Sequence, residues 1–130
     1  MGKILVEVSV GELLDKISIL EIKKEKIKDP EKIKFIDNEY DILKSKLDQN
    51  IKSDDKLNTL FKSLKEINSK LWFIEDDKRL CEKNSDFSEK FIKLSRDVHF
   101  LNDDRAKIKL EINEYTGSVI REIKEYTKYN

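Results

Sequence analysis

Two long stretches of this chain repeat apolar residues at alternating spacings of three and four. The first covers residues 57–81 and the second covers residues 87–115. This average period of 3.5 residues places the apolar side chains on one stripe of a helix, as in a coiled coil. Because only a short polar link separates the two stretches, they predict a long, coiled-coil-like antiparallel hairpin over about residues 54–83 and 86–115.

The apolar seam of each predicted helix is interrupted once by a cation. Lys78 stands on the first seam and Arg105 on the second. A charged group on an apolar stripe must be paired, extend to water, or wait for an anionic ligand. Arg105 is therefore the first residue that we assign to a candidate ligand site.

Two shorter helices are predicted before the hairpin, over about residues 10–28 and 30–47. Ser9 is the expected N-cap of the first, with a glutamate three residues later that fits a capping box. Asp29 and Pro30 are the expected N-cap and first residue of the second. The apolar faces of both helices predict that they pack against neighbours.

Short extended arms are expected at both ends of the chain. Residues 3–8 are rich in β-branched side chains, and residues 118–130 follow Gly117, a helix stop. The pattern of the second segment leaves open a short helix or an arm that pairs with the first. At 130 residues, with 42% charged residues, three glycines and one proline, we expect a single all-α domain over residues 1–130, built as an antiparallel helical bundle.

Charge, cysteine count and hydropathy exclude several classes of protein. The formal net charge is zero, from 27 basic and 27 acidic residues, which argues against nucleic acid as a partner. One cysteine and one histidine cannot form an internal disulfide or a structural zinc site. No apolar run approaches the roughly 18 residues of a membrane-spanning helix. We expect a soluble, cytoplasmic protein with no membrane contact, no metal and no cofactor.

No recognised catalytic motif is present. The chain has no phosphate-binding glycine loop, no nucleophile elbow and no paired-histidine metal helix. His99 and Cys81 fit packed side chains on or beside the seams, and neither supports a mechanism. The sequence therefore leans against an enzyme.

A concentration of charged and amide side chains in the hairpin, together with two residues of the first helix, forms the candidate ligand site. Its residues are Asp15, Lys16, Glu75, Asp76, Arg79, Arg96, Asn102, Asp103 and Arg105. Arginines would bind phosphate and carboxylates would accept from hydroxyls. The alternative interpretation is a solvated surface with weak ion pairs.

Four aromatic side chains are candidate interface residues, because aromatic anchors dominate many protein interfaces. They are Trp72, Phe73, Tyr126 and Tyr129. For Trp72, the alternative is packing against the two shorter helices. For the two tyrosines, the simplest interpretation is a docking arm.

Residues 6–23, VEVSVGELLDKISILEIK, resemble the opening of a family of small helical proteins of unknown function from bacteria and their phages. Three further sets of residues are similar to later motifs of that family: Leu71, Trp72, Ile74, Glu75, Asp76 and Arg79; residues 102–106 with Lys109 and Asn113; and Gly117 and Ser118 followed by Glu122, Lys124 and Tyr126. The resemblance covers essentially the whole chain. It implies a helical domain and gene neighbourhoods for surface-glycan assembly, and it implies no activity.

Three functional hypotheses follow. The first is an interaction or scaffold module that self-associates, with a dimer favoured, or that binds a protein partner, in surface-polysaccharide assembly. The second is a binder or modifier of an anionic small molecule, such as a sugar nucleotide or a phosphosugar, through the Arg/Asp cluster. Nucleic-acid binding is the third and weakest, because acidic residues interleave with the lysine-rich stretch 23–34.

Overall fold

The computed structural model describes residues 2–129, which contain four α-helices and no strand. The helices are α1 (Val10–Lys26), α2 (Pro30–Asn50), α3 (Asp55–Lys83) and α4 (Glu89–Thr116). The prediction of an all-α helical bundle is confirmed. Met1 and Asn130 lie outside the described residues, and Asn130 is the last residue of the second predicted arm.

The helix ends lie where capping residues stand in the sequence. Ser9 and Asp29 each accept a backbone hydrogen bond at 3.0 Å from the first turns of α1 and α2. Asp54 does the same for α3 at 2.8 Å. Gly117 ends α4 with φ at +66°, a left-handed conformation that glycine adopts without a steric penalty.

α4 begins three residues later than predicted. Ser85, the residue before the predicted start, is of a type that often caps helices, but it has φ at +52° and follows the end of α3. The backbone N–H of Asp86 donates to the Cys81 carbonyl at 2.8 Å, which closes the last turn of α3. Ser88 instead occupies the N-cap position of α4.

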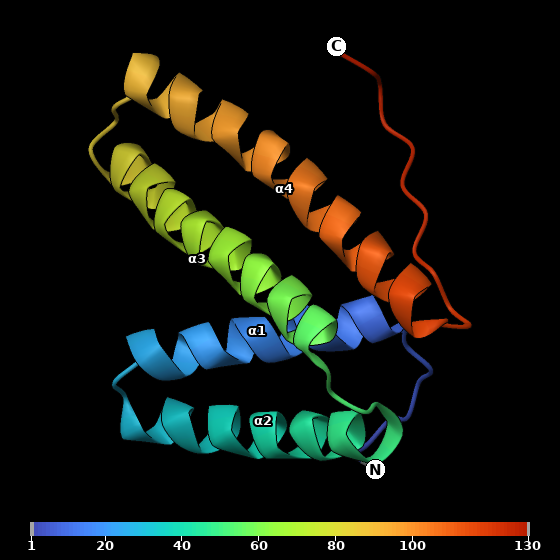
Figure 1. Ribbon diagram of the computed structural model, residues 1–130. Helices are drawn as coiled ribbons and strands as arrows, with labels where there is room; N and C mark the ends of the chain where they lie inside the picture. Colours follow the sequence, from blue (N-terminus) through green and yellow to red (C-terminus); the bar gives the residue numbers. More distant parts are fainter. Residues whose placement is uncertain (1, 130) are drawn as a thin grey trace.

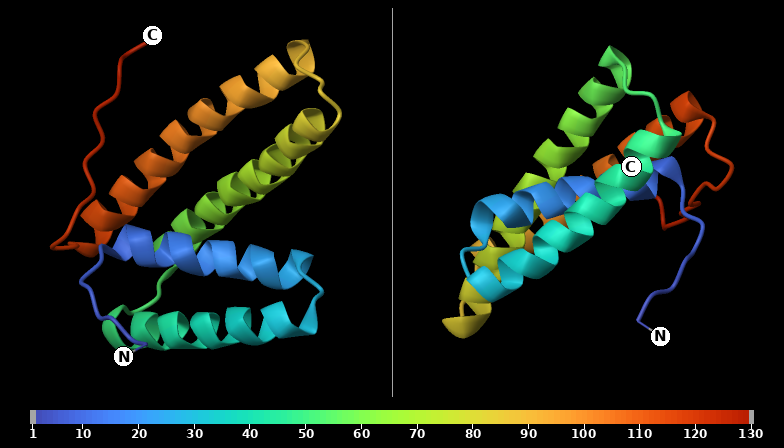
Figure 2. Two further views of the ribbon diagram at one scale, coloured as in Figure 1. Left: turned by 180° about the vertical axis from the view of Figure 1, so that it is seen from behind. Right: turned by 90° about the horizontal axis from the view of Figure 1, so that it is seen from below.

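The four helices form two antiparallel hairpins that cross. α3 and α4 run side by side as the long hairpin, and the shorter pair α1 and α2 lies across one end of it (Figure 1). Among the described helices, α1 packs against the other three, whereas the backbone of α2 comes close to that of α1 alone. The views in Figure 2 place α1 between α2 and the long hairpin. α1 is therefore the element that joins the two hairpins.

The hydrophobic core lies where α1 crosses the long hairpin. Leu14, Leu57, Leu64 and Ile112 form its buried cluster, with Leu47 of α2 packed at the edge. Leu64 and Ile112 have no exposed surface. At this end of the hairpin, α1 therefore packs against the apolar seams of α3 and α4 that the sequence predicted.

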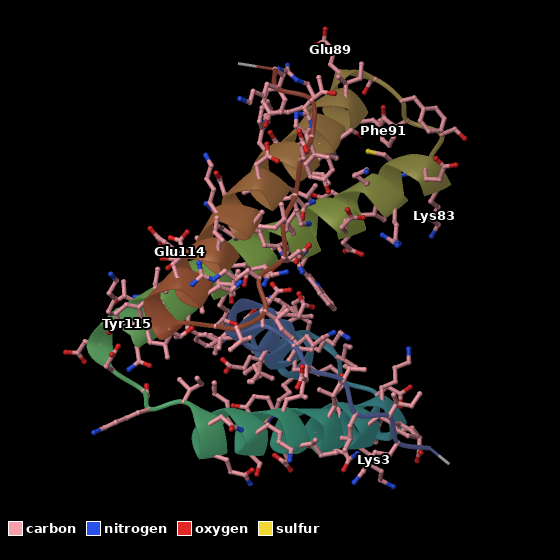
Figure 3. The ribbon with its side chains drawn as sticks, turned by 90° about the vertical axis from the view of Figure 1, so that its right-hand side faces the viewer. Lys3, Lys83, Glu89, Phe91, Glu114 and Tyr115 are labelled. Atoms are coloured by element: carbon pink, nitrogen blue, oxygen red, sulfur yellow. The ribbon has the colours of Figure 1, made fainter. Side chains whose placement is uncertain are left out.

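The other end of the long hairpin, residues 77–98, extends beyond α1 and α2, and we call it the outer half. Figure 3 labels the helix ends at its tip, Lys83 and Glu89, far from α2. Figures 1 and 2 show no third helix against it. Leu80, Phe87 and Ile92 are 49%, 55% and 54% exposed there.

Both arms are extended, so the short helix left open for the second arm does not form within the described residues, and the arms do not pair with each other. They leave the body together, where the Val10 backbone N–H donates to Ser118 Oγ at 3.2 Å. From this point they run in opposite directions (Figure 1). Ile4, Leu5 and Val6 are largely exposed in the first arm.

Candidate functional site

A buried ion pair links α1 to α4. Asp15 is 1% exposed. The Arg105 guanidinium donates to both of its carboxylate oxygens, from Nε to Oδ1 at 2.9 Å and from Nη2 to Oδ2. This is the two-pronged geometry in which arginine binds a carboxylate most strongly. The cation on the α4 seam is therefore paired within its own chain.

Two further side chains complete this buried cluster. Asn68 of α3 donates from Nδ2 to Asp15 Oδ1 at 2.9 Å and to Ser18 Oγ at 2.8 Å. Ser18 in turn donates to the Asp15 carbonyl at 2.8 Å. Every buried side-chain N or O atom in the described part of the chain has a hydrogen-bond partner. Sequence reasoning missed Asn68 and Ser18 as members of the site, because neither breaks a periodic pattern.

The environment of Asp15 favours its charged form. Burial alone would raise the pKa of this carboxyl, but the hydrogen bonds from Arg105 and Asn68, with the positive charges of Arg105 and Lys109, outweigh that effect. The pKa of Asp15 is consequently lowered from its ordinary value of 3.8. A lowered folded-state pKa stabilises the fold above the unfolded pKa, and this stabilisation is lost as the pH falls through the folded pKa.

Asp15→Asn is therefore expected to destabilise the protein more at neutral than at acid pH. The ionised Asp15 carboxylate stabilises the native protein, and this stabilisation begins to fall only when the pH drops below the ordinary pKa of an aspartate. The unfolding free energies of the two proteins should therefore converge below about pH 4. Chemical denaturation of both proteins from about pH 7 to about pH 2 measures this difference. A gap in unfolding free energy that stays constant over that range would contradict the assignment.

A second polar cluster ties the start of α1 to α4 and to the second arm. Lys109 donates to Glu12 at 2.7 Å and to Glu122 at 3.1 Å. Burial alone would lower the pKa of Lys109, but these two carboxylates raise it. Since Glu12 is engaged by Lys109, it does not reach back to the Ser9 backbone, and only half of the predicted capping box forms.

The backbones of α1 and α4 approach each other closely at Gly11. Its N–H donates to Asn113 Oδ1 at 2.7 Å. A Cβ at this position would lie 2.5 Å from the Lys109 carbonyl oxygen and 2.9 Å from Asn113 Oδ1. Glycine is therefore required here by space, and its φ is not in the left-handed region.

An open groove of about 680 Å³ lies beside the Asp15–Arg105 pair. α1 forms one wall with Ile19 and Lys26, and Arg105 lies at its α4 end. α3 supplies most of its polar and aromatic lining: Asn68, Trp72, Phe73, Glu75, Asp76 and Arg79. Arg79 pairs with Glu75 at 3.2 Å, and Lys26 lies over the Phe73 ring at 4.5 Å.

The groove brings together only part of the predicted ligand site. Glu75, Asp76, Arg79 and Arg105 line it, Asp15 lies behind Arg105, and Asn102 accepts a long hydrogen bond of 3.4 Å from Arg105. Lys16 is exposed and faces Glu12 at 3.7 Å. Arg96 and Asp103 lie elsewhere. The predicted site is therefore divided between two places.

Arg96 and Asp103 line a separate hollow between α4 and the second arm, together with Tyr126 and Tyr129. Tyr129 donates to Asp103, and its ring meets those of His99 and Phe100 with centroids 5.4 and 5.6 Å away. Of the predicted interface aromatics, the two tyrosines thus lie in this hollow, and Trp72 and Phe73 line the groove.

Three further features bear on the kind of site that the chain offers. Within residues 2–129, no cluster of three or more metal-ligating side chains exists. No helix in that part of the chain is long and apolar enough to cross a membrane. Cys81 is a buried free thiol on the α3 seam.

Comparison with known proteins identifies a family but no activity. The model of DUF6165, a family of unknown function, matches residues 4–129. The chain belongs to this family. No curated protein and no solved structure shows significant similarity to it. The match to DUF6165 includes both arms as well as the four helices, so the arms are part of the region that the family shares.

Proposed function

We propose that this DUF6165 protein is a helical interaction module that self-associates as a dimer through the outer half of its long hairpin. The observation that carries the proposal is its surface area. The chain exposes 9702 Å², whereas a compact monomer of 15.4 kDa is expected to expose about 7,200 Å². The excess, about 2,500 Å², reflects the uncovered outer half and the two arms.

Part of this excess lies on the outer half, and that part is the surface that a second copy would cover. Obligate homodimer interfaces remove about 1,000–2,500 Å² of surface from each subunit. The outer half offers Leu80 on α3, Ile92 on α4 and Phe87 between them, each about half exposed. Leu80 and Ile92 lie beside the seam, where the partner helix of the hairpin leaves them exposed, and pairing two hairpins would give a four-helix bundle. A second copy of the chain is the partner that we propose.

Sedimentation equilibrium over a range of protein concentrations tests this proposal. We expect a dimer that the double substitution Leu80→Ser with Ile92→Ser weakens by at least about tenfold, since burial of each side chain contributes roughly 1.5–3 kcal/mol. Phe35→Ser is the matched control, because Phe35 is 76% exposed on α2, away from the outer half. The proposal would be contradicted if the native chain stayed monomeric, or if Phe35→Ser weakened the dimer as much as the double substitution does.

The resemblance described above implies surface-glycan assembly as the setting of such a module, and that link stays a prediction. Binding of an anionic small molecule, the second hypothesis, is weakly supported. Arg79 and Arg105 each bind a carboxylate of the chain itself, so neither is left as an uncompensated positive charge for a phosphate. Thermal-shift measurements with pyrophosphate and sugar phosphates test it, because a ligand of this kind would stabilise the native state.

A further inference from the structure

The groove beside Asp15 contains one hydrogen-bond donor that is held in a fixed position. A guanidinium has five N–H donors, and Asp15 uses two of those of Arg105. A third is directed at Asn102 across a long 3.4 Å. The Arg105 side chain is 28% exposed and lines the groove. Because Asp15 fixes its orientation, the remaining donors are positioned before any ligand arrives.

The groove also contains an aromatic surface and one carboxylate without an ion-pair partner. Trp72 is partly exposed along it and is the single tryptophan of the chain. Glu75 and Asp76 stand one turn further along α3. Within the part of the chain that the structure describes, no cation lies within ion-pair distance of Asp76, so its carboxylate can accept hydrogen bonds from a ligand.

The charges around the groove balance. The positive groups are Lys26, Arg79 and Arg105, and the negative groups are Asp15, Glu75 and Asp76. A polyanion would gain little from this arrangement, because Arg79 and Arg105 are each paired with a carboxylate that would repel the ligand. The site suits a molecule without net charge that carries both donors and acceptors.

We propose that this groove binds an uncharged, polyhydroxylated ring, which is the chemistry of a saccharide. Hydroxyl groups donate to Asp76 and accept from Arg105, and the C–H face of a pyranose ring packs on the indole of Trp72. Each of these three contacts comes from an ordered helix. The proposal does not rest on self-association, because the groove is complete within one chain.

Trp72 makes the test direct, because its fluorescence reports on the groove alone. The native protein is titrated with three neutral probes, maltotriose, cellotriose and chitotriose, and with pyrophosphate as the anionic probe, all to millimolar concentration. We expect at least one neutral probe to give a saturable change in Trp72 emission and pyrophosphate to give none. A response to pyrophosphate alone, or no response to any of the three saccharides, overturns the proposal.

Asp76→Asn should weaken binding of the responding saccharide by about tenfold or more, because a charged acceptor is lost while the side-chain shape is kept. Asp77→Asn is the matched control, since Asp77 is exposed on the same helix but does not line the groove. Equal losses in both variants would contradict the assignment. Sedimentation of the same samples reports self-association separately, so the failure of either proposal can be recognised on its own.

Discussion

Arg105→Leu is expected to destabilise the protein by about 3–5 kcal/mol, because it leaves the Asp15 carboxylate buried without its charged partner. Asp15 has almost no contact with water, so solvent cannot replace the two lost hydrogen bonds. In a chain of this size, the loss should lower the melting temperature by about 10–20 °C. Thermal or chemical denaturation monitored by circular dichroism measures the change.

Arg79→Leu is the matched control for this substitution. Arg79 also pairs with a carboxylate, Glu75, but its side chain is 75% exposed. Its removal should change the unfolding free energy by no more than about 0.5 kcal/mol. If Arg105→Leu were neutral or stabilising instead, the guanidinium would be only an interruption of the apolar seam, and the buried pair would carry no structural role.

Gly11→Ala is expected to destabilise the protein by about 2–3 kcal/mol, although alanine favours helix over glycine by about 1 kcal/mol. The added Cβ would meet the Lys109 carbonyl oxygen, which belongs to the backbone of α4 and cannot rotate away. The two helices would have to separate, and the hydrogen bond from Gly11 to Asn113 would weaken.

Denaturation by urea measures this effect, with Lys16→Ala as the control on the exposed side of α1. That substitution should stay within about 0.5 kcal/mol of the native protein. An alanine at position 11 that raises stability would mean that α1 and α4 are further apart than the structure places them.

Local sequence signals were enough to predict most of the helical framework. The seams of α3 and α4 have a period that only a helix satisfies, and Ser9, Asp29 and Gly117 mark helix ends by their own hydrogen-bonding and backbone preferences. The start of α4 was predicted wrongly because Ser85 can cap a helix or end one. The choice depends on the bond from Asp86 to Cys81, which belongs to the preceding helix.

The candidate site was only partly predictable, because its partners lie far apart in the chain. Arg105 was identified from the sequence because it is a charged residue on an apolar seam, and a buried charge requires a partner. That the partner is Asp15 depends on how α1 crosses the hairpin, and the helical period carries no information about crossing. For the same reason Arg96 and Asp103 were grouped with Arg105, although α4 presents them to the second arm.

The central claim, self-association through the outer half of the hairpin, is tested most directly by hydrogen exchange at two protein concentrations, one above and one below the dimer dissociation constant. Slower exchange at the higher concentration should be confined to residues 77–98, because amides covered by a second copy open less often. Amide exchange that becomes slower in α2 instead, or exchange that does not depend on protein concentration, would contradict self-association through the outer half.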